Sequence, residues 1–227
     1  MLGQAGETEF DLRFYCFGVP VRVHPMFWAM GLFVVWQATD DPRLKFLGVL
    51  CVFLSVLVHE MGHALVVRKY GFPSEIVLYG MGGYATSVGL STWRNIWMSF
   101  AGPLAGFILY GIVYGIFLGL LELNPEVLRN PAVMFAVNML LWINLWWGIM
   151  NLLPVLPLDG GRIMQSFVTR YFPRNSQRRV LIISIISAAA VCYFGFRVQD
   201  RFLMILFGLL CAQSVIAYNE LNTGRRF

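Results

Sequence analysis

The chain has 227 residues, of which 58% are hydrophobic and only 13% are charged, and it carries a net charge of +5. About 25% of the residues of a soluble globular protein are charged, so this composition excludes an ordinary soluble domain and indicates a membrane protein. The basic residues are scattered between apolar stretches and form no single stripe, which argues against nucleic-acid binding. The four cysteines are isolated, so the sequence predicts neither disulfides nor a thiolate metal site.

Apolar stretches of roughly 20 residues, the length that crosses a hydrocarbon core, are separated by short charged clusters. The sequence therefore predicts an α-helical membrane protein with about six transmembrane helices and a short interfacial β-hairpin or sheet element. A short strand or hairpin is expected over residues 14–23, and two strands around a glycine turn within 71–93. The predicted spans are residues 25–39, 44–70, 95–121, 132–153, 179–196 and 202–218.

The chain is expected to divide into an N-terminal cytoplasmic or interfacial segment, 1–24, a core of four helices, 25–162, and two C-terminal helices with a tail, 163–227. With six spans, the loops on the side of the N-terminus hold 12 of the 17 basic residues and the opposite loops hold 5. The positive-inside rule then predicts a multi-pass integral membrane protein with both termini in the cytoplasm. The first span is expected to direct insertion, because no cleaved signal peptide is evident.

The sequence His59-Glu60-Met61-Gly62-His63 lies inside an otherwise apolar or small run, residues 49–67. Residues four apart stand on one face of a helix, so His59 and His63 can offer imidazole nitrogens to one metal ion. Glu60 lies about 100° around the helix from His59 and can reach a water molecule beside the metal from the side. This is the position of a general base.

A catalytic zinc usually has three protein ligands, so another His, Asp or Glu is expected at similar depth. Ten of the 12 acidic residues lie in predicted loops or tails, and only Glu60 and Asp159 fall in or beside an apolar span on the correct side. His24 precedes the first span and is expected to be interfacial. Because an unpaired carboxylate at membrane depth is costly, Asp159 is predicted as the third ligand.

These residues resemble the site-2 protease family of intramembrane zinc metalloproteases, peptidase family M50. The resemblance rests on residues 59–63 and on residues 151–161, which read Asn-Leu-Leu-Pro-Val-Leu-Pro-Leu-Asp-Gly-Gly. Two glycine-containing segments, 80–83 and 101–106, add to it, and it covers about residues 21–162. The chain resembles a compact form without a PDZ or CBS domain, because the last two predicted helices occupy most of the chain after residue 179.

The resemblance implies one zinc ion per chain, bound by His59, His63 and Asp159, with Glu60 as the catalytic residue. It also implies that Asn151 contacts the substrate backbone or the developing oxyanion. The glycine hairpin, with Gly82 and Gly83, is expected to offer an edge that pairs with an extended substrate. The expected reaction is hydrolysis of peptide bonds in transmembrane or membrane-anchored proteins near the cytoplasmic face.

Two other interpretations remain open at this point. The same ligands would suit a membrane protein that binds or transports metal, although the last two predicted helices contain no acid or histidine to continue an ion path. A catalytically silent pseudoprotease would also keep the ligands. Separately, the glycines of the third span, Gly102, Gly106 and Gly111, are expected to serve close helix packing and not the catalytic site.

Overall fold

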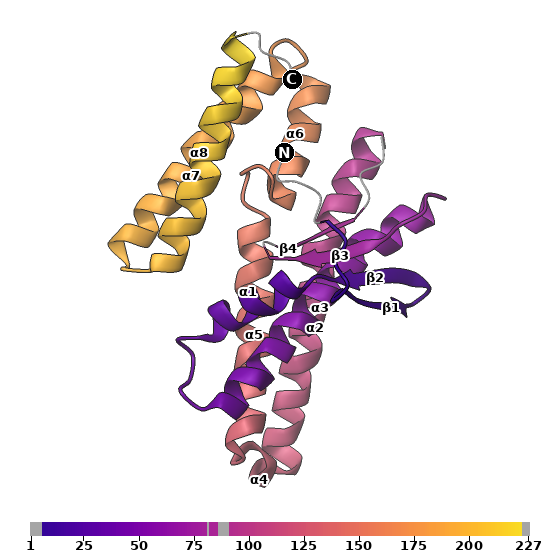
Figure 1. Cartoon of the computed structure of the whole chain (residues 1–227), viewed down its shortest axis with the longest axis vertical. Helices are drawn as coiled ribbons and strands as arrows, with labels where there is room; N and C mark the ends of the chain where they lie inside the picture. The colour runs from indigo at the N-terminus through magenta and orange to yellow at the C-terminus, as the bar shows by residue number, and fades with distance from the viewer. Residues whose placement is uncertain (1–5, 81, 86–90, 224–227) are drawn as a thin grey trace. The chain divides into compact units, whose positions relative to one another are not determined.

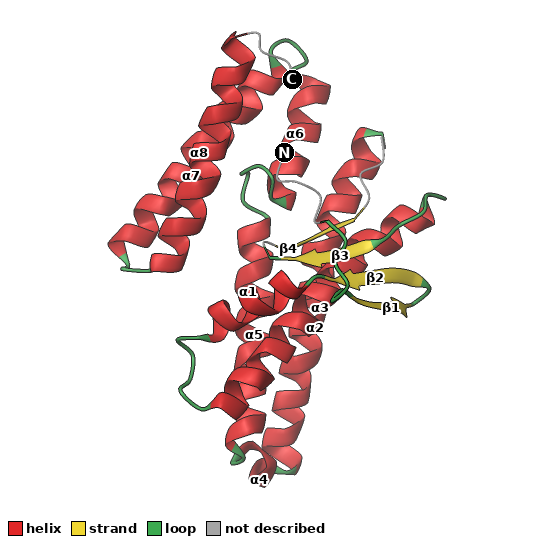
Figure 2. Ribbon diagram, in the orientation of Figure 1, coloured by secondary structure: helices red, strands yellow, loops and turns green. Residues whose placement is uncertain are grey.

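The computed structural model describes residues 6–80, 82–85 and 91–223. The chain forms two compact units: Met1–Gly89 with Ala101–Gly148, and Leu90–Phe100 with Ile149–Phe227. Helices make up most of both units, and the first unit also holds a small sheet (Figures 1 and 2). The predicted class, an α-helical membrane protein with a small sheet element, is confirmed.

The helices of the first unit begin where the sequence places capping groups. His24 Nδ1 accepts a hydrogen bond from the Met26 backbone N–H at 3.1 Å, and the Asp41 carboxylate accepts one from the Arg43 N–H at 2.8 Å. A proline follows each cap in the first helical turn, where its missing N–H costs nothing. These helices are α1 (Pro25–Val35), α2 (Pro42–Lys69), α3 (Thr92–Leu123), α4 (Pro125–Leu128) and α5 (Pro131–Asn151), with α3 and α5 each running into the second unit.

Five helices of the described chain are long and apolar enough to cross a membrane, namely α2, α3, α5 and two helices of the second unit. Their ends lie within five residues of the predicted spans. The exception is α1, which was predicted as a full span. It has 11 residues, a length of about 17 Å, because the apolar run gives way to the polar residues before Pro42. By its own length α1 does not cross the hydrocarbon core.

The sheet has the order β1-β2-β3-β4, with strands Leu12–Cys16, Val19–Val23, Ile76–Tyr79 and Gly82–Ala85. The two strands predicted around the glycine turn form β3 and β4, and the segment predicted as a short strand or hairpin forms the hairpin of β1 and β2; both pairs are antiparallel. Left-handed backbone at Phe17 and Gly18 closes the first hairpin. The sequence did not predict that β2 would pair in parallel with β3. This pairing brings the N-terminal segment to the end of α2 that carries Lys69.

The core of the first unit lies between one face of the sheet and α2. The apolar residues of the central strands that face α2 are almost fully buried, and the intervening Arg22 and Val77 are also buried, with 8% and 3% exposed. Apolar side chains of α1, α2 and α5 complete this core, whose buried members include Val21, Val23, Ile76, Leu78, Phe27, Val52, Val56 and Ile143. The sheet and α5 therefore hold α2 in place.

The second unit contains α6 (Asp159–Tyr171), α7 (Ser176–Arg197) and α8 (Arg201–Thr223). The last two form a helical hairpin, as predicted, and pack through a core of Val155, Ala188, Phe207 and Leu210. No predicted span covers residues 154–178, whereas α6 occupies residues 159–171 of this stretch. Its apolar residues recur at helical spacing among arginines, so α6 is amphipathic and too polar to be recognised as a span.

Candidate metal centre

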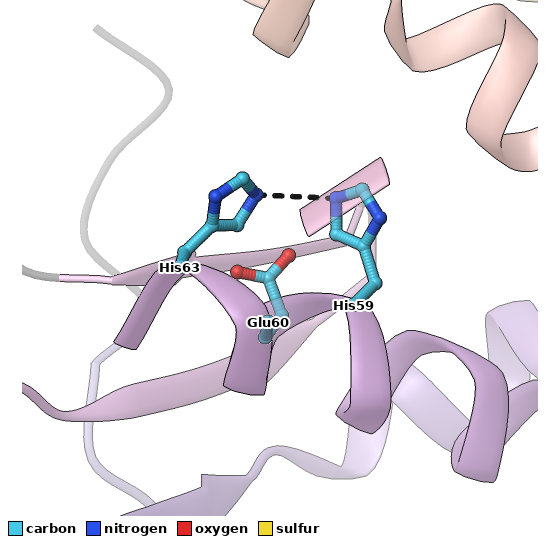
Figure 3. A group of neighbouring side chains, drawn as sticks. All are labelled: His59, Glu60 and His63. Atoms are coloured by element: carbon cyan, nitrogen blue, oxygen red, sulfur yellow. Dashed lines mark hydrogen bonds between the residues drawn. The ribbon is translucent and has the colours of Figure 1, made fainter. Parts of the chain in front are cut away.

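The side chains of His59, Glu60 and His63 project from the C-terminal half of α2 toward one another (Figure 3). Each is buried, with 4%, 6% and 7% of its surface exposed. One donor atom from each residue lies within 4.8 Å of the other two. Among the described residues, these three form a group that could hold a metal ion. The sequence predicted His59 and His63 as ligands and Glu60 as the general base, and these roles stay predictions.

The spacing of the two imidazoles fits a shared metal. His59 Nε2 and His63 Nε2 are 3.2 Å apart. Two nitrogens that each lie about 2.0 to 2.1 Å from one tetrahedral zinc ion are about 3.3 Å apart. The pair therefore needs little rearrangement to bind zinc.

Helix α3 packs against this turn of α2 through small residues. A side-chain carbon added at Gly62 would overlap the carbonyl oxygen of Ala101. Likewise, a carbon added at Gly102 would overlap the His63 ring and lie 2.8 Å from His59 Nε2. In a membrane, where apolar helices gain little by leaving lipid, such small residues permit close helix association. Here they also bring the α3 backbone against the imidazole donors.

The glycines of α3 therefore differ in role, in contrast to the common packing role expected for them. Gly102 lies directly against both histidines, so it belongs to the wall of the site. A carbon added at Gly111 would meet no described atom within 4 Å, so within the described residues Gly111 shows no close packing contact of this kind. At Gly106 the nearest atoms belong to Asn144, at 3.6 Å or more.

A buried hydrogen bond joins α2 to α5 one turn before His59. Asn144 Nδ2 donates to Ser55 Oγ at 2.9 Å and to the Leu140 carbonyl oxygen at 2.8 Å. Both Asn144 and Ser55 are almost fully buried, with 3% and 4% exposed. Asn144 was not predicted from the sequence, although a lone asparagine inside an apolar span is a signal of this kind.

Asp159 and Asn151 belong to the second unit, so their part in a common site with the α2 residues stays a prediction. Asp159 is buried at the N-terminus of α6, where the helix dipole favours a negative charge. The next residue, Gly160, lies so close to the carbonyl oxygens of Leu152 and Leu153 that a side chain there would overlap them. Asn151 is the last residue of α5. The segment between them thus folds back tightly on itself.

Gly82 and Gly83 begin β4, an outer strand of the sheet within the described residues. They pair with Tyr79 and Leu78 of β3. Their contact with substrate stays a prediction.

Comparison with known proteins settles the family. The model of "Peptidase family M50" matches residues 47–124 and 119–194. The chain belongs to peptidase family M50. The matched region includes the part of α2 that carries His59 and His63, and it also includes Asp159.

Among its relatives, zinc metalloprotease MJ0392 of Methanocaldococcus jannaschii is 32% identical over 162 residues, which are 70% of this chain and 45% of that protein. Putative zinc metalloprotease sll0528 of Synechocystis is 31% identical over 183 residues, 74% of this chain and 46% of that protein. The chain therefore spans about half the length of these curated relatives. A solved structure, the site-2 protease from Methanocaldococcus jannaschii, has the same fold, with a TM-score of 0.60, 22% identity and coverage of 92% of this chain and 95% of that chain.

Proposed function

We propose that this protein is an intramembrane zinc metalloprotease that hydrolyses peptide bonds of transmembrane or membrane-anchored proteins. The observation that carries the proposal is the burial of His59, Glu60 and His63 on one apolar helix, with the imidazole nitrogens at zinc-binding distance from one another. Three buried ionisable groups in such a helix are costly without a cation. The zinc metalloprotease names of the relatives support the same reaction.

The proposed centre holds one zinc ion per chain, bound by His59, His63 and Asp159. Zinc in such a position supplies Lewis acidity toward a scissile carbonyl and toward a water molecule. Glu60 has its carboxylate within 4.8 Å of the imidazole donors, so it is placed to take a proton from that water and deliver it to the departing amine. Residues 25–162 are the proposed catalytic core, and residues 163–227 form the proposed C-terminal region of two spanning helices and a tail.

Substrate binding is proposed at β4 and at the end of α5. The hydrogen bonds of a helical substrate shield its carbonyl groups, so the substrate must be extended before attack. An extended segment that adds to β4 alongside Gly82 and Gly83 would be held open by main-chain hydrogen bonds. The Asn151 amide is proposed to donate a hydrogen bond to the developing oxyanion.

We further propose that both termini are cytoplasmic and that cleavage takes place near the cytoplasmic face. Although α1 is short, β2 pairs with β3, so Arg13 and Arg22 stand at the same end of α2 as Arg68. Arg68 donates a hydrogen bond to the Phe17 carbonyl oxygen at 3.0 Å across this junction. The count of 12 basic residues against 5 assumed that α1 crosses the membrane. Because the strand pairing keeps Arg13 and Arg22 on the side of Arg68, the count is compatible with the short α1.

The proposed function is tested with the purified full chain, by metal analysis and by cleavage of a panel of single-span substrates in liposomes. About one zinc per chain and cleavage that stops on adding a zinc chelator are expected. Asp159→Ala should lose zinc, whereas Asp40→Ala, a change away from the buried group, should keep it. Metal flux through the liposomes without proteolysis would instead support a transporter, and bound zinc without any cleavage would support a pseudoprotease.

A further inference from the structure

A groove lies between α6 and α7 in the second unit. It has a volume of about 320 Å³ and is lined by Val168, Phe172, Arg179, Ile182 and Ile183. Four of these side chains are apolar and one is a cation. The groove plays no part in the proposed catalytic reaction, and its lining is independent of the metal ligands.

The groove sits in a strongly basic stretch of the chain. Residues 160–199 contain six arginines and no aspartate or glutamate, and five of the six lie between 162 and 179. Arg178 turns to α8, where it donates a hydrogen bond to Asn222 Oδ1 at 2.5 Å and lies 6.0 Å from the Tyr218 ring. Arg179 instead lies over the Phe172 ring at 5.5 Å, at the edge of the groove. It is therefore the cation that faces a ligand in the groove.

The order of groups along the groove matches the order of groups in a phospholipid. Arg179 stands in the first turn of α7, a helix long and apolar enough to span a membrane, so its guanidinium lies at the membrane surface. Ile182 and Ile183 follow one turn deeper. The wall opposite is formed by Val168 of α6 and by Phe172, the residue after it. Helix α6 is amphipathic and carries a contacting pair of aromatic rings, Phe167 and Tyr171, 4.6 Å apart; amphipathic helices with aromatic residues on the apolar face lie in the membrane interface.

We propose that this groove binds one anionic phospholipid, with the phosphate at Arg179 and the upper part of one acyl chain against Val168, Phe172, Ile182 and Ile183. A guanidinium binds phosphate with charge-assisted hydrogen bonds, and the apolar lining excludes a purely polar ligand. The surrounding arginines favour a lipid with net negative charge over a zwitterionic one. The volume is at the lower end of small-molecule pockets, so only part of the lipid is enclosed.

The test uses the purified full chain in a neutral detergent, titrated with phosphatidylglycerol and, separately, with phosphatidylcholine. Bound lipid is counted by native mass spectrometry, and zinc content checks that each variant is folded. The wild type is expected to bind phosphatidylglycerol more tightly than phosphatidylcholine. Arg179→Gln should weaken phosphatidylglycerol binding at least about fivefold. The matched control Arg197→Gln changes an exposed arginine at the other end of α7 and should leave binding unchanged.

A second variant separates the acyl-chain contact from the charge. Ile183→Trp fills the groove and keeps Arg179, so it should also weaken lipid binding. Unchanged phosphatidylglycerol binding in both variants, or equal binding of the two lipids, would overturn the proposal. Displacement of the lipid by inorganic phosphate at the same concentration would also overturn it, because the site would then recognise a phosphate ion and not a lipid.

Discussion

Helix α2 and each of the two helices of the α7–α8 hairpin have similar mean hydropathy, but they differ in the polar side chains that they bury. All three helices are long and apolar enough to cross a membrane. Within the described residues, α2 buries two histidines, a glutamate and a serine, whereas the polar side chains that α7 and α8 bury are serines, Ser184 and Ser214. Hydropathy indicates that a segment spans the membrane, but buried ionisable groups indicate which span carries chemistry, because lipid cannot solvate them.

The two regions also differ in how much of each helix is buried, and α2 is the more buried. In the most apolar window of α2, 50% of the residues are buried, against 28% in α7 and 17% in α8. The sheet, α1 and α5 pack on α2, and α3 approaches it closely at Gly62, whereas α7 and α8 pack chiefly on each other. The ionisable groups thus occur in the most enclosed helix, where neighbours can fix their geometry.

The largest expected effect comes from removing an imidazole of α2. His63→Ala should weaken zinc binding at least about 100-fold, since loss of a ligand exceeds the 10- to 100-fold effect of changes around a ligand. Zinc affinity is measured by competition with a chelator. His24→Ala is the control, because His24 caps α1 and lies outside the group. Equal zinc affinity in His63→Ala and the wild type would remove α2 from the metal site.

The contact between α3 and the histidines can be tested with two glycines of the same helix. Gly102→Ala introduces a methyl group against both imidazoles and should weaken zinc binding about 10- to 100-fold. Gly111→Ala adds the same group in open space and should have no effect on zinc. The ligand spectrum of the cobalt-substituted protein should change in the first variant alone. A matching change in Gly111→Ala would show that the effect is not local.

The hydrogen bond between α5 and α2 should contribute a smaller amount. Asn144→Ala leaves the buried Ser55 hydroxyl without its donor and should lower the free energy of unfolding by about 1 kcal/mol. It should also weaken zinc binding, because Ser55 lies one turn before His59. Unfolding is followed in detergent by thermal melting. Asn138→Ala, at an exposed position of the same helix, serves as the control. Identical melting of the two variants would contradict a role for this bond.

The smallest expected effect comes from replacing the buried serine of α7, a change in the α7–α8 hairpin that is compared with the changes in α2. Ser184 Oγ accepts a hydrogen bond from the Leu156 N–H at 3.1 Å. Ser184→Ala should lower the free energy of unfolding by about 1 kcal/mol or less and leave zinc affinity unchanged. The melting temperature and the zinc affinity are measured on one sample. A loss of zinc in this variant would contradict the conclusion that the metal site depends on α2 and not on the α7–α8 hairpin.

Much of the fold and part of the site could be predicted because they depend on local patterns. Apolar stretches and their charged ends locate the spans to within five residues, apart from α1. The grouping of His59, Glu60 and His63 follows from helical spacing alone. Helix α6 was missed because its alternation of arginines and apolar residues indicates no span. The sequence signal for α6 is the helical spacing of its apolar residues along one face.

Other features depend on contacts between segments far apart in the sequence. The parallel pairing of β2 with β3 joins residues more than 50 positions apart, and no local pattern specifies it. The contact of Gly102 with the histidines depends on how closely α3 approaches α2. The same holds for Asn144 and Ser55, which are 89 positions apart. The role of Asp159 remains a prediction, supported by elimination among the acids and by its burial.

The most direct test of the proposed chemistry is cleavage of a single-span substrate in liposomes by Glu60→Gln, with zinc measured in the same sample. Glutamine keeps the size of the side chain but cannot accept the proton. We expect the zinc content of the wild type and cleavage slowed by about 10²- to 10⁴-fold. Cleavage at the rate of the wild type would contradict the mechanism, because the buried carboxylate between the two histidines would then have no part in the reaction.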